Sequence, residues 1–530
     1  MIKNYIKRTI MAAVVLFSAT ACLDDLDLEP KNEVTSAVVY EDFANYKNVL
    51  AKLYGGYSLT GQQGPAGRGD VAGIDEGASS YFRTYWMLQE LPTDEAVLAW
   101  VNDPGVSGLN LMDWTASNAL SKAMYYRIYY QITLANEFIR ETSDEKLSGR
   151  GITGQDAELA RMYRAEARFL RALSYWHALD LYGSVPFVTE EDEVGAFSPE
   201  QISRADLFDY IEEELLAIES ELAAPMQNEY ARVDQAAAWT LLAKLYLNAE
   251  VYTGEALYTE AITYAKKVID AGFTLHPEYE ELFLADNDNA QGIILPIAFD
   301  GINSQSYGGT NFIIHAAIGG SMVAADYGVN GGWGGLRTTK ELVALFPPAE
   351  EDDRAMFYTD GQELEITDIS TFTDGYAVTK FKNITSEGEP GSDPTLAFVD
   401  TDFPLFRLAD VYLIYAEAVL RGGSGGDVGT AVDLANQIRN RAYEGEFGTI
   451  TPAELTLDFI LDERARELYW EAHRRTDLIR YGLFVGNEYV WPWKGGVMEG
   501  QAVEPCRVLY PIPFDDIIAN PNLDQIDCYE

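Results

Sequence analysis

The chain has 530 residues, and its 38 basic and 84 acidic side chains give a net charge of −46. A field this negative repels nucleic acid and anionic membrane surfaces, so neither is expected as a partner. Disorder is excluded too, because 47% of the residues are hydrophobic and 12% are aromatic, enough to build a sizeable core. The length suits three or four domains, or one large helical domain with insertions.

Residues 1–21 are predicted to form a signal peptide. Three basic residues among the first eight precede a short apolar run, residues 10–17, which is too short to span a bilayer. Four small residues then lead to Cys22, a pattern typical of a bacterial lipoprotein signal, in which this cysteine becomes the lipidated N-terminus. The alternative is an ordinary signal peptide followed by an unrelated cysteine.

Helical periodicity dominates much of the chain. Apolar residues recur at helical spacing, and glycines lie at or just beyond the ends of several segments. The predicted helices cover residues 115–141, 156–182, 204–223, 234–251, 256–271, 406–421, 429–443 and 453–481. In the pairs 234–251 with 256–271 and 406–421 with 429–443, small residues let two helices approach closely, as in tetratricopeptide hairpins. The alternative is an irregular helical bundle, because such pairs are few and scattered.

Two regions, residues 55–114 and 272–405, are predicted to be rich in loops. The second has ten glycines between residues 301 and 335, which disfavour long helix and suit loops that present side chains. Short strands are predicted at 293–297 and, from alternation, at 373–382. We therefore predict a mainly α-helical fold of tetratricopeptide-like hairpins, with a loop-rich insertion that carries short strands.

The two cysteines near the end of the chain, Cys506 and Cys528, are 22 residues apart. In an exported protein the oxidising surroundings would allow them to form a disulfide. Two buried thiols are the alternative, and both remain open, because the sequence does not show whether the Cβ atoms meet.

Three long motifs are shared with one protein family. They lie at residues 165–173 with 181–186, 463–468 with 474–482, and 510–513 with 520–523. Together with the lipoprotein-like start, they resemble the SusD/RagB family of outer-membrane nutrient-binding lipoproteins. The acidic run at 23–27 resembles the surface-export signal of Bacteroidetes lipoproteins, whereas residues 525–529 depart from the family's closing pattern.

The resemblance implies a single domain over residues 22–530, anchored by lipid to the outer membrane and facing the extracellular side. It also implies a protein without catalytic activity that captures glycans and delivers them to a SusC-like TonB-dependent transporter. The loops of the two loop-rich regions would build the binding site, and the helices would be the scaffold.

The resemblance extends to a starch-binding member of the family, in which an aromatic arc with polar neighbours holds a curved α-glucan. The matching residues are Asp75, Arg83, Trp100, Asp103, Tyr307 and Trp333. Asp103 stands where the relative has an asparagine, and Asn102, one residue earlier, is the alternative for that contact. Leu98 stands where the relative has a tryptophan close to the arc. The expected ligand is starch or a maltooligosaccharide, and another glycan such as a β-glucan is the alternative.

These residue types suit a sugar. The apolar C–H face of a pyranose packs on Trp or Tyr, while Arg83 can donate to its hydroxyls and Asp75 can accept from them. Each contact contributes about 1 kcal/mol, so a short oligosaccharide binds weakly and a polymer gains by repeated engagement. Five other tryptophans are predicted to lie in the core: Trp86, Trp114, Trp176, Trp239 and Trp470.

A structural calcium ion is a further expectation. Residues 286–289 and 400–402 are dense in carboxylate and amide oxygens, and an Asp-x-Asp in extended chain places both carboxylates on one face. The resemblance implies Ca²⁺ held by Asp288, Asp400 and Asp402. The alternative is a pair of solvated turns, which are common in so acidic a chain.

Catalysis has little support in the sequence. Its four histidines show no metal-binding spacing. Pairs of carboxylates, which glycosidases need, are abundant here by chance. Two other classes remain as alternatives: a surface glycoside hydrolase on a helical scaffold, and a scaffold protein without a ligand.

Overall fold

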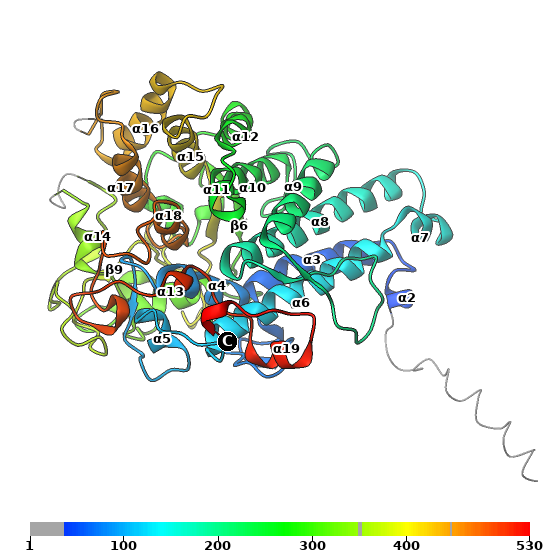
Figure 1. Cartoon of the computed structure of the whole chain (residues 1–530), viewed down its shortest axis with the longest axis horizontal. Coiled ribbons are helices and arrows are strands. Elements are labelled where there is room, and N and C mark those ends of the chain that lie inside the picture. Colours follow the sequence, from blue (N-terminus) through cyan, green and yellow to red (C-terminus); the bar gives the residue numbers. More distant parts are fainter. Residues whose placement is uncertain (1–35, 348–351, 446–447, 530) are drawn as a thin grey trace, which may run out of the picture. The chain divides into compact units, whose positions relative to one another are not determined.

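The computed structural model describes residues 36–347, 352–445 and 448–529 (Figure 1). The predicted signal peptide and Cys22 lie outside these residues. The chain divides into two compact units, residues 1–46 and 47–530. In the described part of the first unit, helix α2 (Ser36–Val39) is followed by Tyr40, whose ring meets that of Tyr46 edge-on at 5.1 Å between centroids.

The remaining structure is mainly helical, which confirms the predicted fold class. The helices after α2 are α3 (Ala44–Ser58), α4 (Tyr81–Glu90), α5 (Val106–Asn110), α6 (Ala119–Glu141), α7 (Asp144–Gly149), α8 (Gln155–Leu181), α9 (Arg204–Ile218), α10 (Gln235–Leu247), α11 (Ala249–Thr253), α12 (Tyr258–Asp270), α13 (Gly309–Ala317), α14 (Lys340–Ala344), α15 (Leu408–Leu420), α16 (Val428–Ala442), α17 (Leu457–Leu468), α18 (Arg474–Arg480) and α19 (Phe514–Ala519). Among the helices described, none combines the length and hydrophobicity needed to cross a membrane.

Helix pairs form where small residues were found at helical spacing. Helix α10 packs on α12, α12 packs on α15, and α15 packs on α16. Figure 1 shows α12, α15 and α16 side by side. Ala237 and Ala243 of α10 and Ala261 and Ala265 of α12 are completely buried. Small side chains there allow the helices to approach closely, so the predicted hairpins are confirmed.

One predicted helix, residues 453–481, is broken in two. Trp470 and Ala472 between α17 and α18 have φ angles of 65° and 63°, in the left-handed region that ends a helix. Two distant carboxylates hold this turn, because Glu95 accepts a hydrogen bond from the Trp470 N–H at 3.0 Å and Glu90 accepts one from the Ala472 N–H at 2.6 Å. Since these partners lie 375 and 382 residues away in the sequence, local periodicity gives no sign of the break.

The strands are short and pair in twos, all antiparallel. The pairs are β1 (Gly61–Gln63) with β2 (Gly67–Gly69), β3 (Val97–Leu98) with β7 (Leu336–Arg337), β4 (Val185–Pro186) with β5 (Gln201–Ile202), β6 (Ile293–Ile297) with β10 (Phe403–Arg407), and β8 (Phe357–Tyr358) with β9 (Ala377–Val378). The strand predicted at 293–297 is confirmed, whereas only two of the ten residues at 373–382 form a strand. The ladder between β3 and β7 joins the two loop-rich regions.

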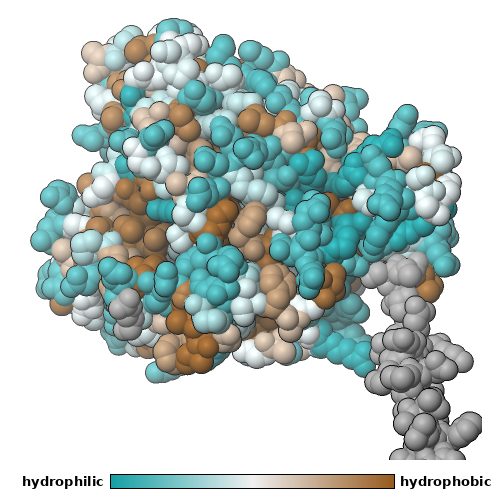
Figure 2. All heavy atoms as spheres, turned by 45° about the vertical axis from the view of Figure 1, so that its right-hand side comes forward, coloured by the Kyte–Doolittle hydropathy of each residue, from teal (hydrophilic) through white to brown (hydrophobic). Residues whose placement is uncertain are grey.

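The core contains complete ion pairs as well as apolar side chains. The Arg354 guanidinium bonds Asp352 at 2.8 Å, Glu463 at 2.8 Å and Glu467 at 3.2 Å, and all four side chains are fully buried. Burial alone would raise the pKa of Glu467, but Arg441, Arg407 and Arg354 outweigh it and hold this pKa well below its usual range. On the surface, Figure 2 shows a face on which hydrophilic residues predominate, as the large negative charge predicts.

Four of the five tryptophans predicted in the core are buried: Trp86, Trp114, Trp176 and Trp470. The fifth prediction was wrong, because Trp239 is only half-buried. Its indole N–H donates to Glu219 at 2.8 Å, and the Lys267 ammonium lies 5.5 Å from the ring centre. A polar edge among charged neighbours thus keeps this ring at the surface of the helical layer.

Cys506 and Cys528 form a disulfide, with their Cα atoms 6.5 Å apart. Of the two alternatives left open by the sequence, the structure has the covalent one. The bond closes a loop near the end of the chain. Within this loop Tyr510 is tied to two helices, because its N–H donates to the Leu181 carbonyl of α8 at 2.7 Å and its hydroxyl donates to the Leu88 carbonyl of α4 at 2.7 Å.

Candidate functional site

The structure brings together the three aromatic residues predicted to form an arc. The rings of Trp100 and Trp333 are 6.3 Å apart at 42°, and those of Tyr307 and Trp333 are 6.4 Å apart at 65°. All three rings remain accessible, since Trp100 and Trp333 are half-buried and Tyr307 is 37% exposed. We call these three residues the aromatic platform.

The short ladder between β3 and β7 aligns two members of the platform. Val97 pairs with Arg337 and Leu98 with Leu336, and the Ala99 N–H donates to the Gly335 carbonyl at 2.9 Å. Trp100 follows the first strand and Trp333 precedes the second, so the antiparallel pairing brings both to the same end of the ladder. Leu98 itself is completely buried and is a core residue.

Helix α13 lies behind the platform and was missed by the sequence interpretation. The N–H of Trp333 donates to the His315 carbonyl at 2.7 Å, and that of Gly335 to the Ala316 carbonyl at 2.8 Å. The Phe312 ring lies 6.1 Å from that of Trp100. Every residue of α13 is buried, so the helix lacks the alternation of apolar and polar faces that reveals a helix in a sequence.

Arg83 lies in the first turn of α4 and also supports the platform. Its Nη1 donates to the carbonyls of Tyr307 at 3.0 Å and Gly77 at 3.3 Å, and its guanidinium stacks over Phe312 at 4.1 Å. Only 8% of the residue is exposed. Arg83 therefore fixes the backbone that carries Tyr307, a positioning role that the predicted contact with sugar hydroxyls did not include.

Burial lowers the pKa of Arg83 to about 10, while the nearby carboxylates of Asp103 and Asp75 oppose this shift. The guanidinium is thus charged at neutral pH. Both aspartates are exposed. Asp75 also holds its own turn, because its Oδ1 accepts from the Ala78 N–H at 2.7 Å.

The three carboxylates predicted to bind calcium also lie near one another. Burial, together with the charges of Asp288 and Asp400, raises the pKa of Asp402 to about 6, while hydrogen bonds from Tyr230 and Phe299 oppose this shift. Their oxygens suit a hard cation chemically. However, Asp402 already accepts from the Tyr230 hydroxyl at 2.5 Å and the Phe299 N–H at 2.7 Å, and no metal-holding group of three or more Asp, Glu, His or Cys side chains occurs in the described ranges.

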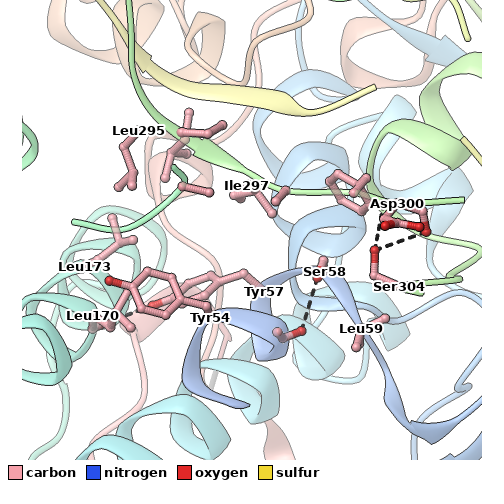
Figure 3. Close-up of a pocket in the computed structure, with 16 residues that line it drawn as sticks. Tyr54, Tyr57, Ser58, Leu59, Leu170, Leu173, Leu295, Ile297, Asp300 and Ser304 are labelled. Atoms are coloured by element: carbon pink, nitrogen blue, oxygen red, sulfur yellow. Dashed lines mark hydrogen bonds between the residues drawn. The ribbon is translucent and has the colours of Figure 1, made fainter. Parts of the chain in front are cut away.

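A separate cavity of about 220 Å³ lies between α3, α8 and β6 (Figure 3). Leu170, Leu173 and Ile297 contribute apolar walls. Its hydroxyls already have protein partners: that of Tyr57 donates to the Leu170 carbonyl at 2.8 Å, and that of Ser304 accepts from the Asp300 N–H at 2.7 Å. The cavity thus offers few polar groups to a ligand rich in hydroxyls, in contrast to the open platform.

The chain is 37% identical to the starch-binding protein SusD of Bacteroides thetaiotaomicron, over 99% of its own length and 100% of that protein. It is 24% identical to the SusD-like protein P25 of Formosa agariphila over 98% of each chain. The SusD family profile matches residues 352–529. The fold is similar to that of the surface glycan-binding protein A of B. thetaiotaomicron solved with laminarihexaose, with a TM-score of 0.70, 19% identity and coverage of 91% and 99% of the two chains. The sequence identity over almost the whole chain shows that this protein belongs to the SusD family.

Proposed function

We propose that this protein binds starch and maltooligosaccharides at the aromatic platform and delivers them to a SusC-like TonB-dependent transporter, without catalysing a reaction. The observation that carries the proposal is the gathering of Trp100, Tyr307 and Trp333 on one accessible surface, with Arg83 behind it. The 37% identity to a starch-binding protein supports the choice of ligand.

The geometry suits a curved chain of sugars. Neighbouring rings are tilted by 42° and 65°, so successive pyranose faces that pack on them must also change direction. An α-linked glucan curves in this way. The exposed carboxylates of Asp75 and Asp103 would accept hydrogen bonds from hydroxyls at the rim.

The alternative ligand is another glycan such as a β-glucan. It is favoured by the two departures from the starch-binding pattern: Leu98 is a buried aliphatic residue, and Asp103 is a charged acceptor where an amide would also donate. A surface glycoside hydrolase is a less favoured alternative, and release of reducing sugar from starch would identify it.

The decisive experiment compares the wild type with a variant in which Trp100, Tyr307 and Trp333 are all replaced by Ala. Calorimetric titration with maltoheptaose should show binding in the roughly micromolar to millimolar range for the wild type and none for the variant. Phe514→Ala is the control, because this ring is 54% exposed on α19 and outside the platform. Thermal melting verifies that each variant is folded. A folded triple variant that binds like the wild type would overturn the site, whereas wild-type binding of laminarihexaose alone would overturn only starch as the ligand.

We also propose that a lipid on Cys22 anchors the protein to the outer membrane, facing the extracellular side. The small residues that lead to Cys22 support this proposal, because they are typical of a lipoprotein signal. The several acyl chains of a lipoprotein anchor it stably, where a single chain is marginal. Replacement of Cys22 by Ala should move the protein out of the membrane fraction. Retention of the unlipidated variant in that fraction would contradict the anchor, and co-purification with the transporter tests the partner.

A further inference from the structure

His315 lies directly behind Trp333. The two rings are stacked, with centroids 4.7 Å apart and planes inclined by only 16°. His315 is 1% exposed, whereas Trp333 is half-buried. The imidazole therefore covers one face of the indole, which leaves the other face for a ligand.

His315 also holds the loop that carries Trp333, through two hydrogen bonds. Its Nδ1 lies 2.7 Å from the Gly331 carbonyl oxygen, and its own carbonyl accepts from the Trp333 N–H at 2.7 Å. Four of the five residues from 331 to 335 are glycines, which have little conformational preference of their own. The loop conformation thus depends on contacts such as these.

The hydrogen bond fixes the protonation of the imidazole. A carbonyl oxygen only accepts, so Nδ1 must carry the proton. Burial lowers the pKa of His315, while the Gly331 and Ala397 carbonyls oppose this shift. The ring is therefore neutral at neutral pH. Nε2 is enclosed and has no hydrogen-bond partner among the residues described.

Phe312 lies one turn earlier on α13 and supports the neighbouring member of the platform. Residues three apart share one face of a helix, so Phe312 and His315 lie on the same face. Phe312 contacts Trp100 and Arg83, and His315 contacts Trp333. One rigid helix thus supports both tryptophans from behind, and their relative tilt depends on it.

We propose that His315 is a positioning residue of the aromatic platform, whose stacked ring and loop hydrogen bond set the tilt of Trp333 against Trp100 and thereby the curvature of the glycan that binds. This inference rests on the proposed glycan-binding function. It assigns the selectivity for curved chains to a buried residue that does not contact the ligand.

The test uses three substitutions that separate the ring from the hydrogen bond. His315→Ala removes both, His315→Phe keeps a stacked ring, and His315→Gln keeps a donor for the Gly331 carbonyl. We expect His315→Ala to bind maltoheptaose on the order of tenfold more weakly, which corresponds to the loss of one or two ring contacts with the sugar. His315→Phe and His315→Gln should each recover part of the affinity. The buried His473, which contacts Lys244 at 3.2 Å, provides the control His473→Ala, expected to lower stability without changing affinity.

A second readout reports the platform without a glycan. Iodide quenching of the Trp333 fluorescence, obtained in each background as the difference from Trp333→Phe, should increase in His315→Ala as the covered face becomes exposed. A purely structural role would lower the melting temperature and leave both the quenching and the affinity of the folded protein unchanged, which would overturn the inference. If the wild type binds no glycan, the proposed function fails, and unchanged quenching would still overturn the positioning role on its own.

Discussion

The indole ring of Trp100 lies over Gly335 with no room for a side chain between them. A Cβ built on residue 335 would be 2.6 Å from Cε2 and 2.7 Å from Cζ2 of Trp100, and 2.8 Å from Cδ1 of Leu98. Real Cβ contacts are never this short, so the glycine is what allows Trp100 to reach its place in the platform. Its role comes from the close approach of a ring and not from the φ angle of a turn.

Gly335→Ala is therefore expected to displace Trp100 and to weaken glycan binding severalfold, at a cost in stability of about 1–3 kcal/mol, because the added methyl group also meets the buried Leu98. Gly331→Ala is a matched control in the same loop, because a Cβ there would have nothing within 4 Å. Titration with maltoheptaose compares the two. Equal affinities for both variants would show that Trp100 does not contribute to binding.

The sequence predicted the amphipathic helices and the glycine-rich region, but it did not predict the helices that hold the site. Every residue of α4, which carries Arg83, and of α13, which carries His315, is buried. Helices enclosed on all sides have no polar face and hence no visible period. The platform residues themselves were predicted from the family resemblance alone. The β3–β7 ladder that aligns Trp100 with Trp333 joins segments more than 200 residues apart, and each strand has only two residues, too few for a recognisable pattern in the sequence.

Removing one partner of the buried ion network should be strongly destabilising. Arg354→Leu would leave the carboxylates of Asp352, Glu463 and Glu467 without this cation, and an uncompensated buried charge costs about 3–5 kcal/mol. The control Lys340→Ala breaks an exposed pair with Glu365 and should cost at most about 1 kcal/mol. Urea unfolding measures both, and similar midpoints for the two variants would refute the argument.

The disulfide should contribute to stability but not to binding. Closing a loop of 22 residues lowers the conformational entropy of the unfolded chain, which stabilises the folded state by about 3 kcal/mol in the chain-entropy account. The double variant Cys506→Ser with Cys528→Ser should melt at a lower temperature and bind maltoheptaose with unchanged affinity. A parallel loss of affinity would place the end of the chain in the binding site.

Calcium binding is tested by chelation. If Asp288, Asp400 and Asp402 hold Ca²⁺, a chelator should lower the melting temperature, because a ligand bound only to the folded state stabilises it. The same treatment of Asp400→Asn provides the control and should have little effect. Identical melting curves of the wild type with chelator and with excess calcium would speak against the ion.

The last prediction concerns acid stability and His177. This residue is buried, its Nδ1 lies 2.7 Å from the Tyr81 hydroxyl, and burial, helped by the Lys244 charge, lowers its pKa to about 3. In the unfolded chain a histidine takes up a proton below pH of about 6.5. The folded form stays neutral there, so the contribution of His177 to stability is complete above that pH and decreases as the pH falls toward 3, by roughly 1.4 kcal/mol per pH unit.

Buried acids also change stability over parts of this pH range, and they do so in both directions. Burial raises the pKa of Glu95 to about 7. The arginines around Glu463 hold the pKa of Glu463 at about 2, against the effect of burial. The difference between the wild type and His177→Gln removes these common contributions, since glutamine keeps a partner for Tyr81 but does not titrate. We expect the stability of the wild type relative to the variant to decline steadily from pH 6 to pH 4 in urea unfolding, and parallel profiles would mean that His177 is protonated in the folded protein.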